Sequence, residues 1–194
     1  PRRGPWPGPV EGWTYTSQYA ACNYAAPKNT TSMVDIYREI APKLPNGVIV
    51  FNGDSDPCVS YEGTQEAVGQ VGFGVREAFR PWFFNATAVS SQLLAKKDVL
   101  FGPSLTRQHE GAQLGGYVVD YEHGLSFATV HGSGHMVPRS RPQAALKLIR
   151  SLLAGRPLSP AFPSLPRLAA MSEAAYASFA EGWTYEARSR PYVE

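Results

Sequence analysis

Two polar loops in this sequence carry residue types that can perform acid–base chemistry. The acid loop, residues 52–57 (NGDSDP), directly follows the apolar run 48–51, and the histidine loop, residues 131–135 (HGSGH), directly follows the strand-like run 126–130. In a catalytic triad a histidine takes the proton of a nucleophilic hydroxyl, while a buried acid holds the imidazole tautomer and stabilises its cation. An acid and a histidine from these loops could fill those two roles, and neither would be useful alone.

Each of the residues concerned also has an ordinary structural interpretation. Aspartates often hydrogen-bond their own backbone in turns, which would explain Asp54 and Asp56 without any catalysis. His135, which is flanked by Gly134 and Met136, could equally be a structural or surface histidine. The residues by themselves leave both interpretations open.

The residues around the loops predict strands that end where the loops begin. The run Val48–Phe51 is short, continuous and apolar, as strands buried on both faces of a parallel sheet are. Residues 117–121 and 126–130 are predicted to form two further strands, joined by a hairpin-like turn at 122–125. Because sites in open α/β sheets are built from loops at the carboxyl ends of strands, we expect the two loops to lie at one sheet edge.

Helices are predicted on both sides of these strands in the sequence. A helix from Met33 to about Ile40 would be capped by Thr31 or Ser32 and stopped by Pro42. Two more helices are predicted, at residues 62–71 and 142–153. The expected fold class is therefore α/β.

The length of the chain, 194 residues, is that of one domain or a large part of one. We expect residues 1–155 to form this domain and residues 156–194 to be a Pro-rich linker with a short helical tail at about 168–180. The stretch 72–116 is predicted to be irregular.

Composition and charge exclude several classes of protein. Apolar residues make up 43% of the chain and charged residues 18%, which is typical of a globular protein and not of a disordered one. The net charge of +2 comes from scattered residues, so no basic stripe predicts nucleic-acid binding. No apolar run is long enough for a membrane span. The Pro-rich start lacks the apolar stretch of a signal peptide, so we expect any targeting signal to lie upstream in a longer precursor.

Cysteines and glycosylation motifs bear on the compartment. The two cysteines, Cys22 and Cys58, are too few for a disulfide framework and have no neighbours at metal-ligand spacing, so no metal is expected. Residues 29–31 (NTT) and 85–87 (NAT) fit the N-glycosylation pattern. These motifs favour the secretory pathway, with a lysosomal, vacuolar or extracellular destination.

Several segments resemble the serine carboxypeptidase family. Residues 48–56 (VIVFNGDSD) resemble its strand and Gly-Asp-x-Asp acid loop, and residues 127–138 (FATVHGSGHMVP) resemble its histidine loop. Residues 141–146 (RPQAAL) resemble the helix that follows, and residues 117–121 (YVVDY) stand where the family has a Gly-Tyr strand. The resemblance covers roughly residues 13–154, and the histidine loop is its most specific part.

The resemblance implies roles for individual residues. Asp56 would be the triad acid, His135 the general base, and Asp54 a structural residue. Met136 would line the leaving-group side of the cleft. Cys58 would be a buried thiol near the site, although a small core residue is an equally good interpretation.

The resemblance also implies what the chain lacks. It corresponds to the C-terminal part of an α/β-hydrolase fold, a mostly parallel sheet flanked by helices that needs an N-terminal half. That half carries the nucleophile motif Gly-x-Ser-Tyr-Ala-Gly, and neither residues 132–134 nor residues 102–106 replace it, because neither fits a nucleophile elbow. The expected partner is an N-terminal chain or segment with this serine, linked through Cys22, whose family counterpart pairs with a first-half cysteine.

The function implied is removal of C-terminal amino acids from peptides through a Ser-Asp-His triad whose serine lies outside this chain, with no cofactor. Two alternatives remain open. The missing serine would fit a non-catalytic subunit with a structural or binding role. A serine-carboxypeptidase-like acyltransferase would use the same triad on an acceptor other than water.

Overall fold

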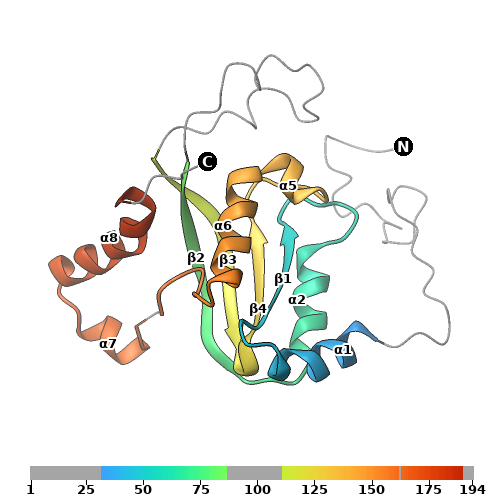
Figure 1. The fold of residues 1–194 in the computed structure, drawn as a ribbon. Coiled ribbons are helices and arrows are strands. Elements are labelled where there is room, and N and C mark those ends of the chain that lie inside the picture. Colours follow the sequence, from blue (N-terminus) through green and yellow to red (C-terminus); the bar gives the residue numbers. More distant parts are fainter. Residues whose placement is uncertain (1–31, 87–110, 162, 190–194) are drawn as a thin grey trace, which may run out of the picture.

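The computed structural model describes residues 32–86, 111–161 and 163–189, with side chains as far as residue 184. Cys22, Asn29 and the segment 102–106 lie outside these residues. The described part contains one four-stranded sheet in the order β1-β4-β3-β2 (Figure 1). Its strands are β1 (Val48–Gly53), β2 (Val75–Ala86), β3 (Gly111–Tyr121) and β4 (Leu125–Val130).

The sheet is mixed, which corrects the expectation of a mostly parallel sheet. Only β1 and β4 are parallel, whereas β2 pairs with β3 and β3 with β4 in antiparallel fashion. The reason lies in the connection of β3 to β4, a single 3₁₀ turn, Glu122–Gly124, which is too short for the crossover that a parallel pair requires. The hairpin predicted from residues 117–130 is therefore confirmed.

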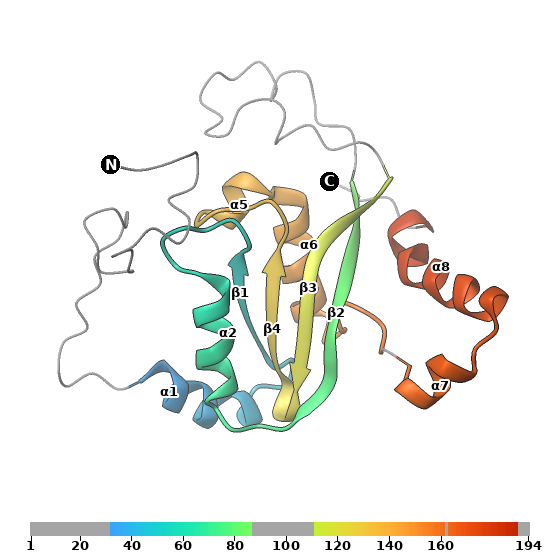
Figure 2. The same cartoon turned by 180° about the vertical axis from the view of Figure 1, so that it is seen from behind.

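Helices cover both faces of the sheet, as Figures 1 and 2 show from opposite sides. α6 lies on one face, and α1 and α2 lie on the other. The helical elements are α1 (Met33–Ile40), a 3₁₀ turn (Ala41–Lys43), α2 (Tyr61–Gly69), α5 (Val137–Ser140), α6 (Pro142–Leu153), α7 (Leu165–Ala170) and α8 (Glu173–Ser189).

Alternation along the central strands builds a core on each face. In β4, Leu125 and Phe127 pack into the core beside α2, while Ala128 and Val130 pack into the core beside α6. Successive strand residues point to opposite faces, so a strand covered on both sides reads as a continuous apolar run. This burial fixes the positions of β1 and β4, whose ends carry the two loops.

The helix caps match the sequence signals. Ser32 caps α1 by accepting a hydrogen bond from the Val34 amide at 3.2 Å, and Ser60 caps α2 in the same way through the Glu62 amide. α6 spans 142–153 as predicted and begins with Pro142, whose missing N–H is not needed in the first turn.

Strand β2 corrects the prediction that residues 72–116 are irregular, since 75–86 form a strand and β3 begins at Gly111. Alternate residues of β2 are buried from Arg80 through Trp82 and Phe84. A charged residue in a buried position and Pro81 beside it obscured this alternation in the sequence. Proline is tolerated here because β2 is the edge strand of the described sheet.

The C-terminal tail is more helical than predicted. Instead of one helix at 168–180 it contains α7 and α8, and the hydroxyl of Ser172 accepts from the Ala175 amide at 3.2 Å to start the second. Before them, Leu158 and Ser159 are buried, and the Arg80 side chain donates to the Pro160 carbonyl at 2.7 Å. Residues 158–160 therefore pack onto the main body.

Candidate active site

The acid loop and the histidine loop lie side by side at the carboxyl ends of β1 and β4, because these two strands are parallel neighbours. Their last residues, Gly53 and Val130, are paired in register. Backbone hydrogen bonds continue beyond the strands, from the Asp54 amide to the Val130 carbonyl at 3.1 Å and from the Ser55 amide to the Ser133 carbonyl at 2.9 Å. The two loops therefore form one rigid platform.

Asp56 and His135 meet on this platform. Asp56 Oδ2 lies 2.9 Å from His135 Nδ1. The Asp56 side chain is 2% exposed and the His135 side chain 55% exposed, so a buried acid stands behind an accessible imidazole. This geometry assigns the proton at Nδ1 to the bond with Asp56 and leaves Nε2 to accept a proton.

Asp56 also performs the capping role that the sequence left open. Its Oδ1 accepts hydrogen bonds from the amides of Cys58 at 2.8 Å and Val59 at 3.2 Å. The Asn52 side chain closes the same loop by donating to the Val59 carbonyl at 2.9 Å. Loop capping uses Oδ1 and the contact with His135 uses Oδ2. The hydrogen bonds to Oδ1 hold the carboxylate so that Oδ2 faces the imidazole.

Asp54 forms a second acid–histidine pair, with His131. Asp54 Oδ2 lies 2.7 Å from His131 Nδ1, and Oδ1 accepts from the Gly132 amide at 2.7 Å. Sequence reasoning did not single out His131. The sequence feature that could have identified His131 is its position directly after β4, which places it opposite Asp54, the first acid of the neighbouring loop.

Gly53 lets the loops approach each other. A Cβ atom at this position would lie 2.1 Å from the Ser133 carbonyl oxygen and 2.5 Å from that of Gly134. Gly132 is required for a different reason, since its φ of +65° belongs to the left-handed region that favours glycine.

The remaining predicted residues lie around the pair. Met136 follows His135 directly and is 56% exposed. Ser133 is fully buried and its hydroxyl donates to the Gly134 carbonyl, so it does not present a nucleophile. Cys58 is buried and disulfide-bonded, which corrects the expectation of a free thiol. The other cysteine of the chain, Cys22, is outside the described residues.

Charged neighbours surround the platform. The Arg141 side chain donates from Nε to the carbonyls of His131 at 3.1 Å and Gly132 at 3.2 Å. Burial lowers the pKa of Arg141, and the charge of Asp54 opposes that shift. The pKa of Tyr61 is raised mainly by the charge of Glu62, with burial and Asp54 adding to the effect. The negative charge of Asp54 thus interacts with Arg141, the N-cap of α6, and with the phenol of Tyr61 in α2.

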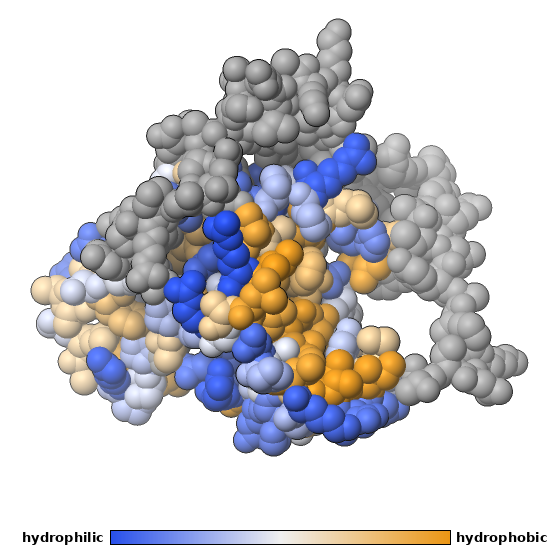
Figure 3. All heavy atoms as spheres, viewed as in Figure 1, coloured by the Kyte–Doolittle hydropathy of each residue, from blue (hydrophilic) through white to orange (hydrophobic). Residues whose placement is uncertain are grey.

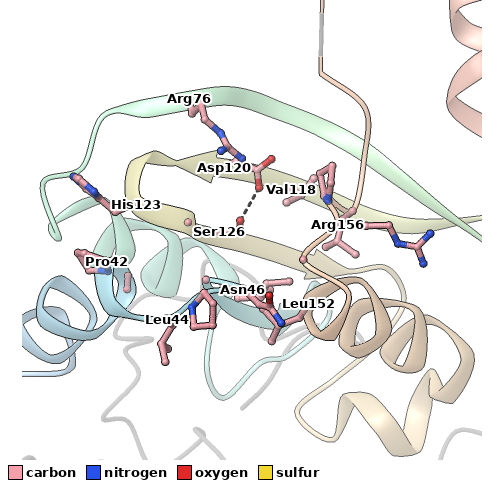
Figure 4. Close-up of a pocket in the computed structure, with 18 residues that line it drawn as sticks. Pro42, Leu44, Asn46, Arg76, Val118, Asp120, His123, Ser126, Leu152 and Arg156 are labelled. Atoms are coloured by element: carbon pink, nitrogen blue, oxygen red, sulfur yellow. Dashed lines mark hydrogen bonds between the residues drawn. The ribbon is translucent and has the colours of Figure 1, made fainter.

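A cavity of about 370 Å³ lies at the opposite end of the sheet, where β1 and β4 begin (Figure 4). Asp120 in its wall is already engaged by Arg80 at 2.5 Å and by the Ser126 hydroxyl at 2.6 Å. In Figure 4 the guanidinium of Arg156 and the ring of His123 point away from its centre. In the same view the side chain of Arg76 points toward Asp120, and none of the contacts described for this cavity joins an acid to a histidine.

The described residues contain no group of three or more His, Cys, Asp or Glu side chains that could hold a metal ion. They also contain no helix with the length and apolar character needed to cross a membrane.

An α/β sheet with a buried acid behind an accessible histidine at its edge is the arrangement used by α/β hydrolases. A sequence profile of the serine carboxypeptidase family matches residues 9–155. The chain belongs to the serine carboxypeptidase family.

Individual relatives agree with this assignment. The chain is 34% identical to "Serine carboxypeptidase 1" of Hordeum vulgare over 110 residues, which are 57% of this chain and 17% of the relative. It is 33% identical to "Serine carboxypeptidase-like 22" of Arabidopsis thaliana over 148 residues, 76% of this chain and 26% of the relative. "Serine carboxypeptidase-like 33" of the same plant is 32% identical over 136 residues, with 70% and 22% covered. The chain thus spans about a quarter or less of these relatives.

Proposed function

We propose that this chain is the C-terminal part of a serine carboxypeptidase and provides the acid and the base of a Ser-Asp-His triad. The observation that carries the proposal is the contact between Asp56 and His135, because a buried carboxylate at 2.9 Å from an accessible imidazole is the geometry a general base needs. Membership of the serine carboxypeptidase family supports it.

The proposed reaction uses His135 twice. Its Nε2 takes the proton of a serine hydroxyl as the serine oxygen attacks the carbonyl carbon of the last peptide bond. The same proton passes to the leaving amino group, which releases the C-terminal amino acid and leaves an acyl-enzyme ester. Water then attacks the ester with His135 again as base, and the serine is restored. Asp56 holds the ring and stabilises its cation in each step.

The serine must come from outside this chain in the proposal. Ser133 is buried, and the aligned parts of the chain cover only 17% to 26% of its relatives. An N-terminal segment or chain that contributes the nucleophile would also cover apolar surface. Phe51 of β1 is 39% exposed, and α6 exposes Ile149 and Leu153. Figure 3 shows a large apolar area on the side of the molecule that faces the viewer in Figure 1.

Three further features stay proposals. Met136 would contact the leaving amino acid, since it is exposed next to the base. A link from Cys22 to the N-terminal chain would require that Cys22 is not the disulfide partner of Cys58, because the chain has two cysteines in total and Cys58 is disulfide-bonded. Secretion, or delivery to a lysosome or vacuole, is proposed from the acceptor motifs at Asn29 and Asn85, of which Asn85 is half-buried in β2.

The test is to isolate the native protein and measure its mass with and without reduction, together with labelling by a fluorophosphonate serine probe. A labelled serine on a longer precursor, or on a second chain that accompanies this one, supports the proposal. An unlabelled native protein would favour a non-catalytic role. Products from a labelled enzyme then separate the two reactions, because hydrolysis releases the free acid whereas acyl transfer yields a new ester or amide.

A further inference from the structure

We propose that Asp54 and His131 are positioning residues: their contact clamps the histidine loop to the acid loop and so sets the distance between Asp56 and His135. This inference rests on the proposed function and gives that reaction two residues outside the proposed triad. The structural basis is that the two acid–histidine pairs join the same two loops.

The Asp54 carboxylate makes contacts with both loops. Oδ2 lies 2.7 Å from His131 Nδ1, Oδ1 accepts from the Gly132 amide at 2.7 Å, and the Ser55 hydroxyl donates to Oδ1 at 3.0 Å. The Asp54 side chain is 26% exposed. Three donors on one partly buried carboxylate form a clamp that a neutral amide, with one oxygen, cannot reproduce.

The clamp lies within a few residues of the catalytic pair on each side. Asp54 is two residues before Asp56, and His131 is four residues before His135. Between them, Gly132 has a φ of +65° and presents its amide to Asp54. Loss of that partner would leave the Gly132 amide without its acceptor and would release the turn that leads to His135.

Arg141 reinforces the clamp from the other side of the histidine loop. Its Nε donates to the carbonyls of His131 and Gly132, so this turn is held by an anion on one side and a cation on the other. Among the described residues, the Asp54 charge acts on Arg141 at the start of α6 and on Tyr61 of α2, which Glu62 adjoins.

The test compares variants of the complete enzyme, in which this chain is joined by the segment that carries the serine. Asp54→Asn and His131→Gln each weaken the clamp, while His131→Arg places a charged donor opposite the Asp54 carboxylate. Asp35→Asn is the matched control, because Asp35 forms an exposed ion pair with Arg38 at 2.7 Å on α1. We expect Asp54→Asn and His131→Gln to lower kcat by about 10- to 100-fold, the scale of a misplacement of about 1 Å, with KM little changed.

Two readouts separate positioning from general stability. We expect His131→Arg to restore most of kcat, whereas Asp35→Asn leaves kcat unchanged. In NMR spectra, the ring proton that His135 shares with Asp56 should shift or broaden in His131→Gln and return in His131→Arg.

The proposal is overturned if folded Asp54→Asn and His131→Gln keep wild-type kcat and an unchanged His135 signal. It is also overturned if His131→Arg is as impaired as His131→Gln, since a charged donor at position 131 would then not support the clamp. If wild-type protein takes no fluorophosphonate label, the proposed function has failed, but the NMR comparison still decides whether the clamp positions His135.

Discussion

Asp56 and His135 are 79 residues apart in the sequence, yet Asp56 Oδ2 lies 2.9 Å from His135 Nδ1. The contact exists because β1 and β4 are parallel neighbours whose ends are paired at Gly53 and Val130. The two loops therefore begin side by side at the carboxyl ends of these strands, which brings the acid and the base into contact. Four predictions follow from this geometry and from the core that supports it.

Replacement of the proposed base should remove catalysis without unfolding the protein. We expect His135→Ala in the complete enzyme to reduce kcat by at least about 10³-fold, because no other group can take the serine proton at that position. His123→Asn is the control, since His123 lies at the far end of β4 with a φ of 56° that asparagine tolerates. Peptide hydrolysis and circular dichroism are the measurements, and substantial hydrolysis by folded His135→Ala would remove His135 from the mechanism.

Replacement of the proposed acid should preserve the loop conformation and favour the wrong tautomer of the His135 imidazole. In Asp56→Asn the amide oxygen can still accept from Cys58 and Val59, but the amide group facing Nδ1 favours the wrong ring nitrogen for the proton. We expect a loss in kcat on the order of 10⁴ if the serine-protease precedent transfers. Steady-state kinetics of the purified variant measure this, and wild-type turnover would exclude Asp56 from the triad.

The close contact of the two loops should make Gly53 sensitive to a single methyl group. We expect Gly53→Ala to lower both the melting temperature and kcat, because its Cβ would lie 2.1 Å from the Ser133 carbonyl oxygen. Gly63→Ala in α2 is the matched control, since nothing lies within 4 Å of its Cβ and alanine favours helices by about 1 kcal/mol. Equal behaviour of the two variants in thermal melts and assays would contradict the proposed packing of the loops.

The ion pair between Arg80 and Asp120 should matter for stability and not for chemistry. Arg80 is 1% exposed and its Nη2 lies 2.5 Å from Asp120 Oδ2. Arg80→Met would therefore leave the buried Asp120 carboxylate without its cationic partner. We expect the free energy of unfolding to fall by about 3–5 kcal/mol. Lys43→Met removes the exposed partner of Glu39 and should leave the denaturation midpoint unchanged. A urea titration compares them, and a midpoint for Arg80→Met equal to that of wild type would rule out a stabilising role.

Much of the framework could be predicted from local signals. Ser32 marked the start of α1, Pro142 marked the start of α6, and the run from Val48 marked β1, because caps and apolar runs act over a few residues. The edge strand β2 was missed because Arg80 occupies a buried position and Pro81 follows it. The burial of Arg80 depends on Asp120, 40 residues away, and local patterns do not contain that partner.

The sequence alone identified the two loops and, through resemblance, the family and the acid and histidine of interest. Without the resemblance, the residues could not show which acid faces which histidine, because loop residues two positions apart have the same local chemistry. The tertiary structure made that decision: the paired ends of β1 and β4 place Asp54 against His131 and Asp56 against His135. Strand register is set by burial on both faces of the sheet, a property of the whole fold and not of either loop.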